Sequence, residues 1–346
     1  MKKRVLAATL GLITVIGMTG CAGSGGTAKG NGAGADFKAS MVCDTGGIND
    51  QSFNQSSWEG LKEFGEENGV EVNYLESTQA SDYPTNFDKL SDEDLNLIWG
   101  VGYNVADSLK ETAELNPDKM FAIVDYDFGE ETPDNVICST FDVQDSSFLV
   151  GYIAGLTTET NKVGFIGGMK SPTIDFFEYG YCAGVDYAAK ELGKEIELNV
   201  QYADSYSDSA KGKAIAKSMY SSGCDVLFHA AGGVGKGAIE EAQEEGKWII
   251  GVDRDQAYLA PDNVLTSALK ITGVATKEIS QKVKDGEDIG GQSFTYGLAD
   301  EAVGIPKENP NLAEGVYDKA MEVQALIEKG EIVVPTTEDE YQQFMK

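Results

Sequence analysis

Residues 37–55 have the sequence FKASMVCDTGGINDQSFNQ. An apolar run from Phe37 to Cys43 ends in Asp44, and a polar, glycine-containing loop then leads into a segment with the pattern of an amphipathic helix. A buried strand that ends in Asp or Gly and is followed by a helix is the unit from which parallel sheets are built. We therefore expect a strand, a loop and a helix here, with the helix beginning at Phe53.

The same alternation of strand and helix continues to residue 253. It is typical of βαβ units, in which helices cover both faces of a parallel sheet. The expected strands are residues 37–44, 70–76, 95–102, 120–127, 135–142, 162–168, 196–204, 225–232 and 248–253. The expected helices include residues 52–68, 104–116, 144–158, 174–192, 208–222 and 236–246. The pattern predicts an α/β protein.

The number of strands indicates two sheets. About eight to ten strands are too many for one comfortable open sheet in a chain of this length. We expect two doubly wound parallel-sheet lobes joined by a multi-strand hinge, with a break near residues 141–146 and later strands at 264–270 and 294–300 that recross between the lobes. The first lobe is predicted to comprise residues 37–142 plus about 271–303, and the second residues 143–270 plus about 304–346. A cleft between two such lobes is a common place for a ligand.

Carboxylates and glycines alternate at the carboxyl ends of the expected strands. Ligands of open parallel sheets bind at these ends. A glycine lets the backbone approach a ligand, and a carboxylate accepts hydrogen bonds from hydroxyl or amino groups. We expect the site to repel phosphate and to hold a neutral polyol, amine or nucleoside. The residues at these ends are Asp44, Gly100 to Gly102, Asp125, Gly167, Gly168, Asp204, Gly232, Gly233 and Asp253.

The loop after the first strand carries candidate ligand contacts. Ser52 and Gln55 have the spacing of a capping box, which predicts the helix start and places the Phe53 ring and the Asn54 amide at the mouth of the cleft. In the alternative interpretation, Phe53 only anchors the helix to the core and Asn54 is a turn residue. Position alone leaves both interpretations open.

The first twenty-one residues, MKKRVLAATLGLITVIGMTGC, resemble a bacterial lipoprotein signal, with Met18 where that pattern usually has Leu. Residues 1–20 are then a signal peptide, and Cys21 carries lipid on the extracytoplasmic face of the cell membrane. An ordinary secretory signal or a membrane helix is the alternative, but the apolar run is shorter than the roughly 20 residues that span a bilayer. Residues 22–36, rich in glycine and alanine, are expected to form a flexible tether.

Composition restricts the partners. The formal net charge is −30, and removal of the signal's three positive charges makes the mature chain more negative still. Such a chain repels nucleic acid and anionic lipid, so we expect no nucleic-acid partner. Cys43, Cys138, Cys182 and Cys224 lie in apolar stretches without CxxC spacing, so buried free thiols are expected rather than disulfides or a metal site. The single histidine, His229, is expected to be a satisfied core residue.

Two segments resemble enzyme motifs. Residues 233–238, GVGKGA, fit the G-x-G-x-x-A pattern of a dinucleotide site, with Asp253 following at a suitable distance. The segment lies in mid-chain with no catalytic His or Tyr constellation, so we expect Lys236 to be a solvated cleft residue. The segment DTGGIND (44–50) faintly resembles the calcium-binding cluster of nucleoside hydrolases, but Gly46 and Gly47 stand where a carboxylate and a proline would be. No cofactor, metal or catalytic activity is expected.

The chain also resembles the basic membrane protein family, the purine-nucleoside-binding lipoproteins of ABC transporters. The resemblance extends over nearly all of residues 38 to about 335. It is carried by SFNQSSWEGL (52–61), WGVGYNVADSL (99–109), SSFLVGYIAGL (146–156), KVGFIGGM (162–169), AKGKAIAKSMYSSGCDVLFHAAGGVGKG (210–237), GVDRDQAYLAP (251–261), VLTSALK (264–270) and TYGLADEAVGI (295–305).

This resemblance implies a type I periplasmic-binding-protein fold that encloses a purine nucleoside (guanosine, inosine or adenosine) and delivers it to the permease subunits of an ABC transporter. The site residues that it implies are Asp44, Phe53, Asn54, Asp125, Phe177, Gly232, Asp253 and Lys270. Where relatives often have Arg or His before the second aromatic residue, this chain has Phe176. The preferred base therefore stays open. Two alternative functions also stay open: a sugar or signalling-molecule receptor that feeds a sensor and, less favoured, an enzyme that acts on nucleosides.

Overall fold

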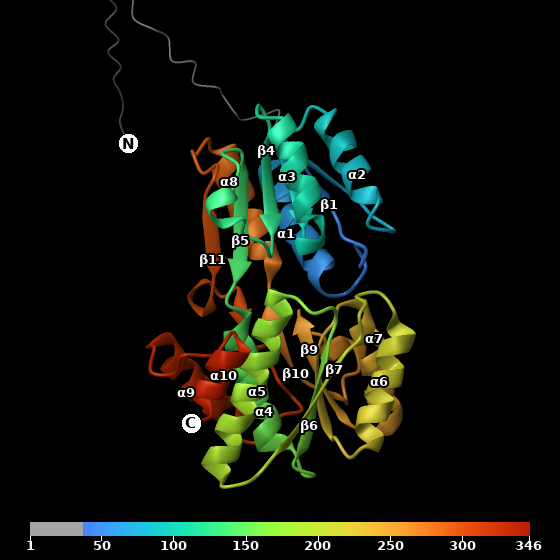
Figure 1. Ribbon diagram of the computed structural model, residues 1–346, viewed down its shortest axis with the longest axis vertical. Coiled ribbons are helices and arrows are strands. Elements are labelled where there is room, and N and C mark those ends of the chain that lie inside the picture. Colours follow the sequence, from blue (N-terminus) through green and yellow to red (C-terminus); the bar gives the residue numbers. More distant parts are fainter. Residues whose placement is uncertain (1–36) are drawn as a thin grey trace, which may run out of the picture. The chain divides into compact units, whose positions relative to one another are not determined.

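The computed structural model describes residues 37–346. The predicted signal peptide, Cys21 and the tether lie outside these residues. No helix within residues 37–346 is long and apolar enough to cross a membrane. This part of the chain contains two six-stranded sheets with helices on both faces, which confirms the predicted class of two parallel α/β units (Figure 1).

The first sheet has the strand order β11-β5-β4-β3-β1-β2, and all its strands are parallel. Its strands are β1 (Lys38–Val42), β2 (Glu71–Leu75), β3 (Leu97–Val101), β4 (Met120–Val124), β5 (Val136–Phe141) and β11 (Ser293–Tyr296). The central strand β3, with the sequence LIWGV, is buried at every position. A strand covered by helices on both faces has no solvent side, so its sequence is a continuous apolar run.

The second sheet repeats this arrangement. Its order is β12-β10-β9-β8-β6-β7, so five strands of each sheet follow the sequence-order pattern 2-1-3-4-5 of a doubly wound fold. The sixth strand of the second sheet, β12, is antiparallel to β10. The strands are β6 (Lys162–Gly167), β7 (Glu197–Tyr202), β8 (Val226–Ala230), β9 (Trp248–Asp253), β10 (Val264–Lys270) and β12 (Val303–Gly304).

Paired helices cover the sheets. Helices α1 and α8 pack together on one face of the first sheet, and α2 and α3 pack on the other. In the second sheet, α4 and α5 form one pair and α6 and α7 the other. The helices are α1 (Phe53–Asn68), α2 (Asp82–Ser91), α3 (Ala106–Leu115), α4 (Val143–Thr157), α5 (Pro172–Leu192), α6 (Ser209–Ser221), α7 (Gly233–Glu245), α8 (Thr272–Lys284), α9 (Val316–Glu328) and α10 (Glu338–Phe344).

Local sequence fixes the ends of α5, the helix that carries Phe177. Ser171 caps its start by accepting a hydrogen bond from the backbone N–H of Ile174, and Pro172 occupies the first turn. Gly193 ends the helix in the left-handed conformation that glycine adopts without strain. The helix therefore begins at the carboxyl end of β6 and points its first turns toward the end of the sheet where ligands bind.

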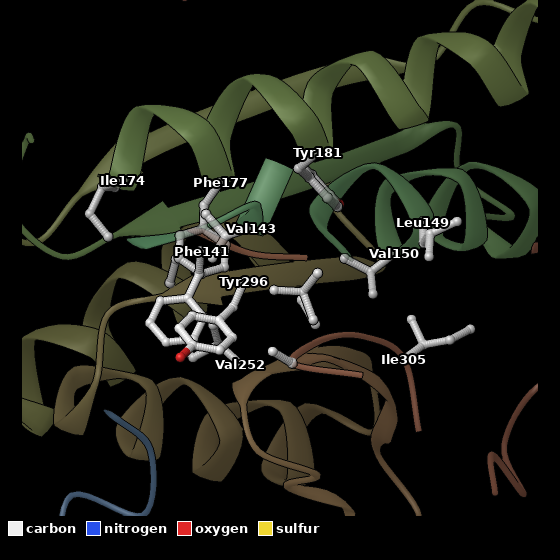
Figure 2. Packing of buried hydrophobic residues seen from close by; sticks show 14 of the residues in the cluster. Phe141, Val143, Leu149, Val150, Ile174, Phe177, Tyr181, Val252, Tyr296 and Ile305 are labelled. Atoms are coloured by element: carbon white, nitrogen blue, oxygen red, sulfur yellow. The ribbon is translucent and has the colours of Figure 1, made fainter. Parts of the chain in front are cut away.

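Within residues 37–346 the chain passes between the two sheets three times: after β5, after β10, and between β11 and β12. At the first and third crossings, Phe141 and Tyr296 stack with ring centroids 5.6 Å apart (Figure 2). The strand predicted at 294–300 is shorter than expected. It ends at Tyr296 because the N–H of Gly297 bonds to Asp300 Oδ2 and starts the short 3-10 helix η4 (Leu298–Asp300).

Candidate functional site

A cavity lies between the carboxyl ends of the two sheets. All eight site residues implied by the sequence line it. The complete lining is Asp44, Gly46, Asp50, Phe53, Asn54, Gly102, Tyr103, Asp125, Thr173, Ile174, Phe177, Tyr206, Ala230, Ala231, Gly232, Val252, Asp253 and Lys270.

Asn54 holds two carboxylates of the β1–α1 loop in place. Its Nδ2 donates to Asp44 Oδ1 at 2.8 Å and to Asp50 Oδ2 at 3.1 Å, and its Oδ1 accepts from the backbone N–H of Asp44 at 3.3 Å. Both hydrogens of the amide are thus engaged, and only 1% of Asn54 is exposed. Asn54 positions Asp44, whose other oxygen faces Asn104 Nδ2 at 3.4 Å and stays available for a ligand.

The predicted capping box at the start of α1 is wrong, although the helix does begin at Phe53. Asp50 caps the helix instead, since its carboxylate accepts from the backbone N–H groups of Asn54 at 2.8 Å and Gln55 at 3.2 Å. The hydroxyl of Ser52 donates to Asp253 Oδ2 in the second sheet, and the side chain of Gln55 bonds to Glu59. The Ser52 hydroxyl therefore bonds to Asp253, far along the chain, and does not cap the start of α1.

Lys270 joins the two sheets at the end of β10. Its Nζ lies 2.5 Å from Asp125 Oδ2, at the end of β4, and 3.8 Å from Asp253 Oδ1, at the end of β9. The three side chains are almost fully buried, so each charge needs its partners. Asp125 and Asp253 both have a left-handed backbone, with φ of 64° and 65°. Such a conformation is uncommon outside glycine and collects at functional sites.

Burial governs the acidity of the site. It raises the pKa of Asp44 and of Asp253, against the opposing effect of hydrogen bonds and of Lys270. Burial also raises the pKa of Asp50 to about 6, although three backbone N–H groups favour its charged form. Four carboxylates share one lysine among the residues that line the cavity. The cavity is therefore suited to a ligand that donates hydrogen bonds and carries no negative charge.

Two phenyl rings approach the lysine from different sheets. The Lys270 ammonium lies 4.4 Å from the centre of the Phe53 ring and 5.5 Å from that of Phe177. Phe53 is half-buried at the start of α1, whereas Phe177 is only 1% exposed and packs on Phe228. Figure 2 shows Phe177 and Ile174 projecting from α5. Flat apolar surfaces thus stand beside the polar groups of the cavity.

The sequence did not indicate nine residues of the lining. Most directly follow a strand end or precede a predicted site residue, so extending the strand-end rule by a few positions would have included them. Tyr206 stands apart, because it lies four residues beyond β7 in a loop whose path the strand pattern does not indicate. The missed residues are Gly46, Asp50, Tyr103, Thr173, Ile174, Tyr206, Ala230, Ala231 and Val252, whereas Gly102 was among the predicted strand-end residues.

The segment that resembled a dinucleotide motif lies within α7, where its glycines serve close packing. A Cβ atom on Gly237 would lie 1.8 Å from the backbone oxygen of Ser209, and one on Gly235 would lie 2.1 Å from the His229 ring. Lys236, predicted to be a solvated cleft residue, is half-buried, and its ammonium donates to the backbone oxygen of Asn49 in the first sheet's β1–α1 loop at 2.6 Å.

His229 is buried in β8 as predicted, with the side chain of Gln256 beside it. Burial lowers the pKa of His229 to about 4, which keeps the ring neutral at physiological pH. The four cysteines within residues 37–346 are buried and unpaired. Within the same residues, no three His, Cys, Asp or Glu side chains gather as a metal site would require.

Comparison with known proteins gives consistent matches. The model of a family described as "ABC transporter substrate-binding protein PnrA-like" matches residues 37–338. The chain is 42% identical over 360 residues to the CD4+ T-cell-stimulating antigen of Listeria innocua. The match covers 97% of this chain and 99% of that protein. It is 38% identical over 358 residues to the ABC transporter nucleoside-binding protein BmpA of Lactococcus lactis subsp. cremoris. That match covers 97% of this chain and 100% of the relative.

Among solved structures, the solute-binding protein of an ABC transporter system from Aeropyrum pernix K1 has a TM-score of 0.78 and 27% sequence identity to this chain. The match covers 89% of this chain and 96% of that one. The match therefore extends over both sheets.

Proposed function

Because the chain belongs to the family of PnrA-like ABC transporter substrate-binding proteins, we propose that its ligand is a purine nucleoside: guanosine, inosine or adenosine. The name of the Lactococcus lactis relative, a nucleoside-binding protein, supports this ligand class. The observation that carries the proposal is the cavity itself, which is lined by two phenyl rings, four carboxylates and one lysine. A purine nucleoside combines a flat ring with hydroxyl and amino donors, and it has no phosphate.

The flat base is matched by Phe53 and Phe177. Stacking of a base on an aromatic ring is worth about 1–3 kcal/mol. In the proposed complex the base lies against these rings, and Asp44, held by Asn54, accepts a hydrogen bond from an N–H of the base. Asp253 accepts from the ribose hydroxyls, while Lys270 balances the charge of Asp125 and Asp253.

Capture requires both sheets, since neither carries the whole set of contacts. Phe53, Asp44 and Asp125 come from the first sheet, and Phe177, Asp253 and Lys270 from the second. We take the two sheets with their helices as lobes that move about the three crossings. A ligand that contacts both lobes shifts the population toward the closed arrangement by its differential affinity for that state. The protein then delivers the closed complex to the permease and performs no catalysis.

Cys21 is the proposed point of attachment to the cell membrane. Lipid on this cysteine would hold the domain on the extracytoplasmic face through the residues between Cys21 and Phe37. Such a tether keeps the local concentration of the receptor at the permease high. Mass spectrometry of the mature protein tests this attachment. We expect a diacylglyceryl group on Cys21. A mature N-terminus elsewhere would contradict it.

A thermal-shift panel separates the proposed ligand from its rivals. Guanosine, inosine, adenosine, uridine, ribose and galactose are compared at equal concentration. A ligand at one hundred times its dissociation constant adds about 2.7 kcal/mol of stability, so a specific ligand stands out clearly. We expect stabilisation by purine nucleosides. Stabilisation by a sugar alone would support a sugar or signalling receptor, and free base or ribose in the incubated sample would reveal an enzyme.

A further inference from the structure

Tyr103 and Tyr206 face each other across the cavity from different sheets. Tyr103 begins the short 3-10 helix η1 (Tyr103–Val105) after β3, and Tyr206 lies in the loop after β7. Both line the cavity. Their hydroxyl oxygens are 3.3 Å apart, and their rings meet edge to face with centroids 6.5 Å apart. The pair is therefore a direct contact between the two sheets that does not involve the charged cluster.

The pair closes the side of the cavity that is remote from the crossings. Strand β7 is the outer edge of the second sheet, whereas β10 and β12, where the chain crosses, form the opposite edge. Lys270, at the end of β10, therefore marks the inner side of the cavity and Tyr206 the outer side. Both tyrosines are only half-buried, as expected for residues at an opening.

The hydrogen bonds around the pair show which tyrosine hydroxyl is the donor. The hydroxyl of Tyr206 donates its one proton to the backbone oxygen of Met169 at 3.3 Å, so the hydroxyl of Tyr103 is the donor between the two tyrosines. Burial raises the pKa of Tyr206, which keeps its hydroxyl protonated. A Cβ atom on Gly168 would lie 2.2 Å from the Tyr206 ring, so this glycine lets the ring rest on the backbone after β6. Tyr206 is thus fixed to its own sheet, and Tyr103 must separate from it when the sheets part.

We propose that Tyr103 and Tyr206 form a gate over the ligand cavity and that their hydroxyl-to-hydroxyl bond sets the rate at which the ligand leaves. The inference rests on the proposed function, because it assumes a ligand enclosed between the sheets. The bond forms only in the closed arrangement. It therefore slows opening and has little effect on the encounter of the ligand with the open protein.

The test is a double-mutant cycle with Tyr103→Phe, Tyr206→Phe and the double variant, using stopped-flow association and dissociation rates. Phenylalanine keeps the ring and removes only the hydroxyl. Each single variant should raise the dissociation rate about threefold to tenfold, the effect of one hydrogen bond, and leave the association rate within about twofold. The double variant should release the ligand no faster than Tyr206→Phe alone, because Tyr206→Phe already removes the bond between the two tyrosines together with the bond to Met169. Unchanged dissociation rates, or effects that simply add, would overturn the gate.

Tyr220→Phe is the matched control. It removes a hydroxyl that bonds to the backbone oxygen of Trp248 at the start of β9, the end of the second sheet that lies away from the cavity. Its rates should equal those of the wild type. The rates are measured with whichever compound of the thermal-shift panel binds the wild type. A sugar as sole ligand would therefore refute the proposed nucleoside specificity while the cycle still decides the gate.

Discussion

At the scale of single residues, the cavity shows a division between groups that face a ligand and groups that position them. Asn54 uses both amide hydrogens to hold Asp44 and Asp50, and Lys270 is engaged by Asp125 and Asp253. The rings of Phe53 and Phe177 make no hydrogen bond or ion pair with these positioned groups. Substitutions of the rings should therefore change affinity, whereas substitutions of the positioning groups should also change stability.

Replacing Phe53 by alanine should weaken binding of a purine nucleoside by about tenfold or more, since stacking is worth roughly 1–3 kcal/mol per base. Phe53 is half-buried, so the fold should persist. Calorimetric titration measures the affinity, and circular dichroism checks the fold. Phe128→Ala removes an aromatic residue of the first sheet that packs on Tyr126 outside the cavity, and it should bind like the wild type. Unchanged affinity in Phe53→Ala would refute the stacking model.

Replacing Lys270 by methionine should destabilise the protein by about 3–5 kcal/mol, because it leaves Asp125 and Asp253 buried without their cation. Urea denaturation at pH 7 measures the loss. Lys110→Met breaks the pair with the exposed Glu131 and should change the stability little, because water screens an exposed ion pair. Equal losses in the two variants would mean that the buried cluster does not depend on Lys270.

The residues of the cavity were partly predictable. The strand-end rule and the family resemblance led to eight residues that the fold brings together around one cavity. The capping box failed because Ser52 bonds to Asp253, and a local pattern carries no information about a partner so far along the chain. Tyr206 was missed for a similar reason, since the loop after β7 reaches the cavity only through packing of its ring on Gly168.

At the scale of elements, helix α1 packs closely against helix α8, although α8 follows the second crossing and lies about 200 residues later in the chain. A Cβ atom on Gly60 would lie 2.1 Å from the backbone oxygen of Gly273. The strand and helix alternation predicted α1 but not α8, α2, α9 or α10. Helix α2, for example, has only ten residues and carries Pro84 in its first turn, so its pattern is weak.

Gly60→Ala should destabilise the protein by about 1–3 kcal/mol or more, because backbone atoms of Gly273 cannot move aside as a flexible side chain could. Differential scanning calorimetry measures the effect. The exposed Lys62→Ala on the same helix should change stability by no more than about 0.5 kcal/mol. A Gly60→Ala protein as stable as the control would show that α1 and α8 can separate without cost.

The first turn of α4, directly after the first crossing, contains a carboxyl with altered acidity. Burial, with repulsion from Asp142, raises the pKa of Asp145 to about 7. A raised carboxyl pKa in the folded state means that the wild type loses stability as the pH rises from about 4 to 7. Asp145→Asn avoids this loss. It should be more stable than the wild type at pH 8, with the difference shrinking to nothing near pH 4.

Urea denaturation at several pH values follows this difference, and the exposed Asp134→Asn serves as the matched control. A gain in Asp145→Asn that grew toward acid pH would contradict the assignment, because it would require a carboxyl with a lowered pKa.

At the scale of the whole molecule, the two sheets share one strand order and exchange their last strands through three crossings. Hydrophobic patterning was sufficient to predict two parallel α/β units, because buried parallel strands have continuous apolar sequences. Patterning did not predict every late strand. The short strand β12, of two residues, is defined by its pairing with β10 and not by any local preference.

The central claim is that this receptor encloses a purine nucleoside between its two sheets. Its most direct test is calorimetric titration of the purified protein with inosine, guanosine and adenosine, alongside ribose and hypoxanthine as the two parts of inosine. We predict one-to-one binding of at least one nucleoside, and much weaker binding of either part, because the rings and the carboxylates of both sheets must be engaged together. Absence of binding by every nucleoside, or binding of ribose as tight as that of inosine, would contradict the account.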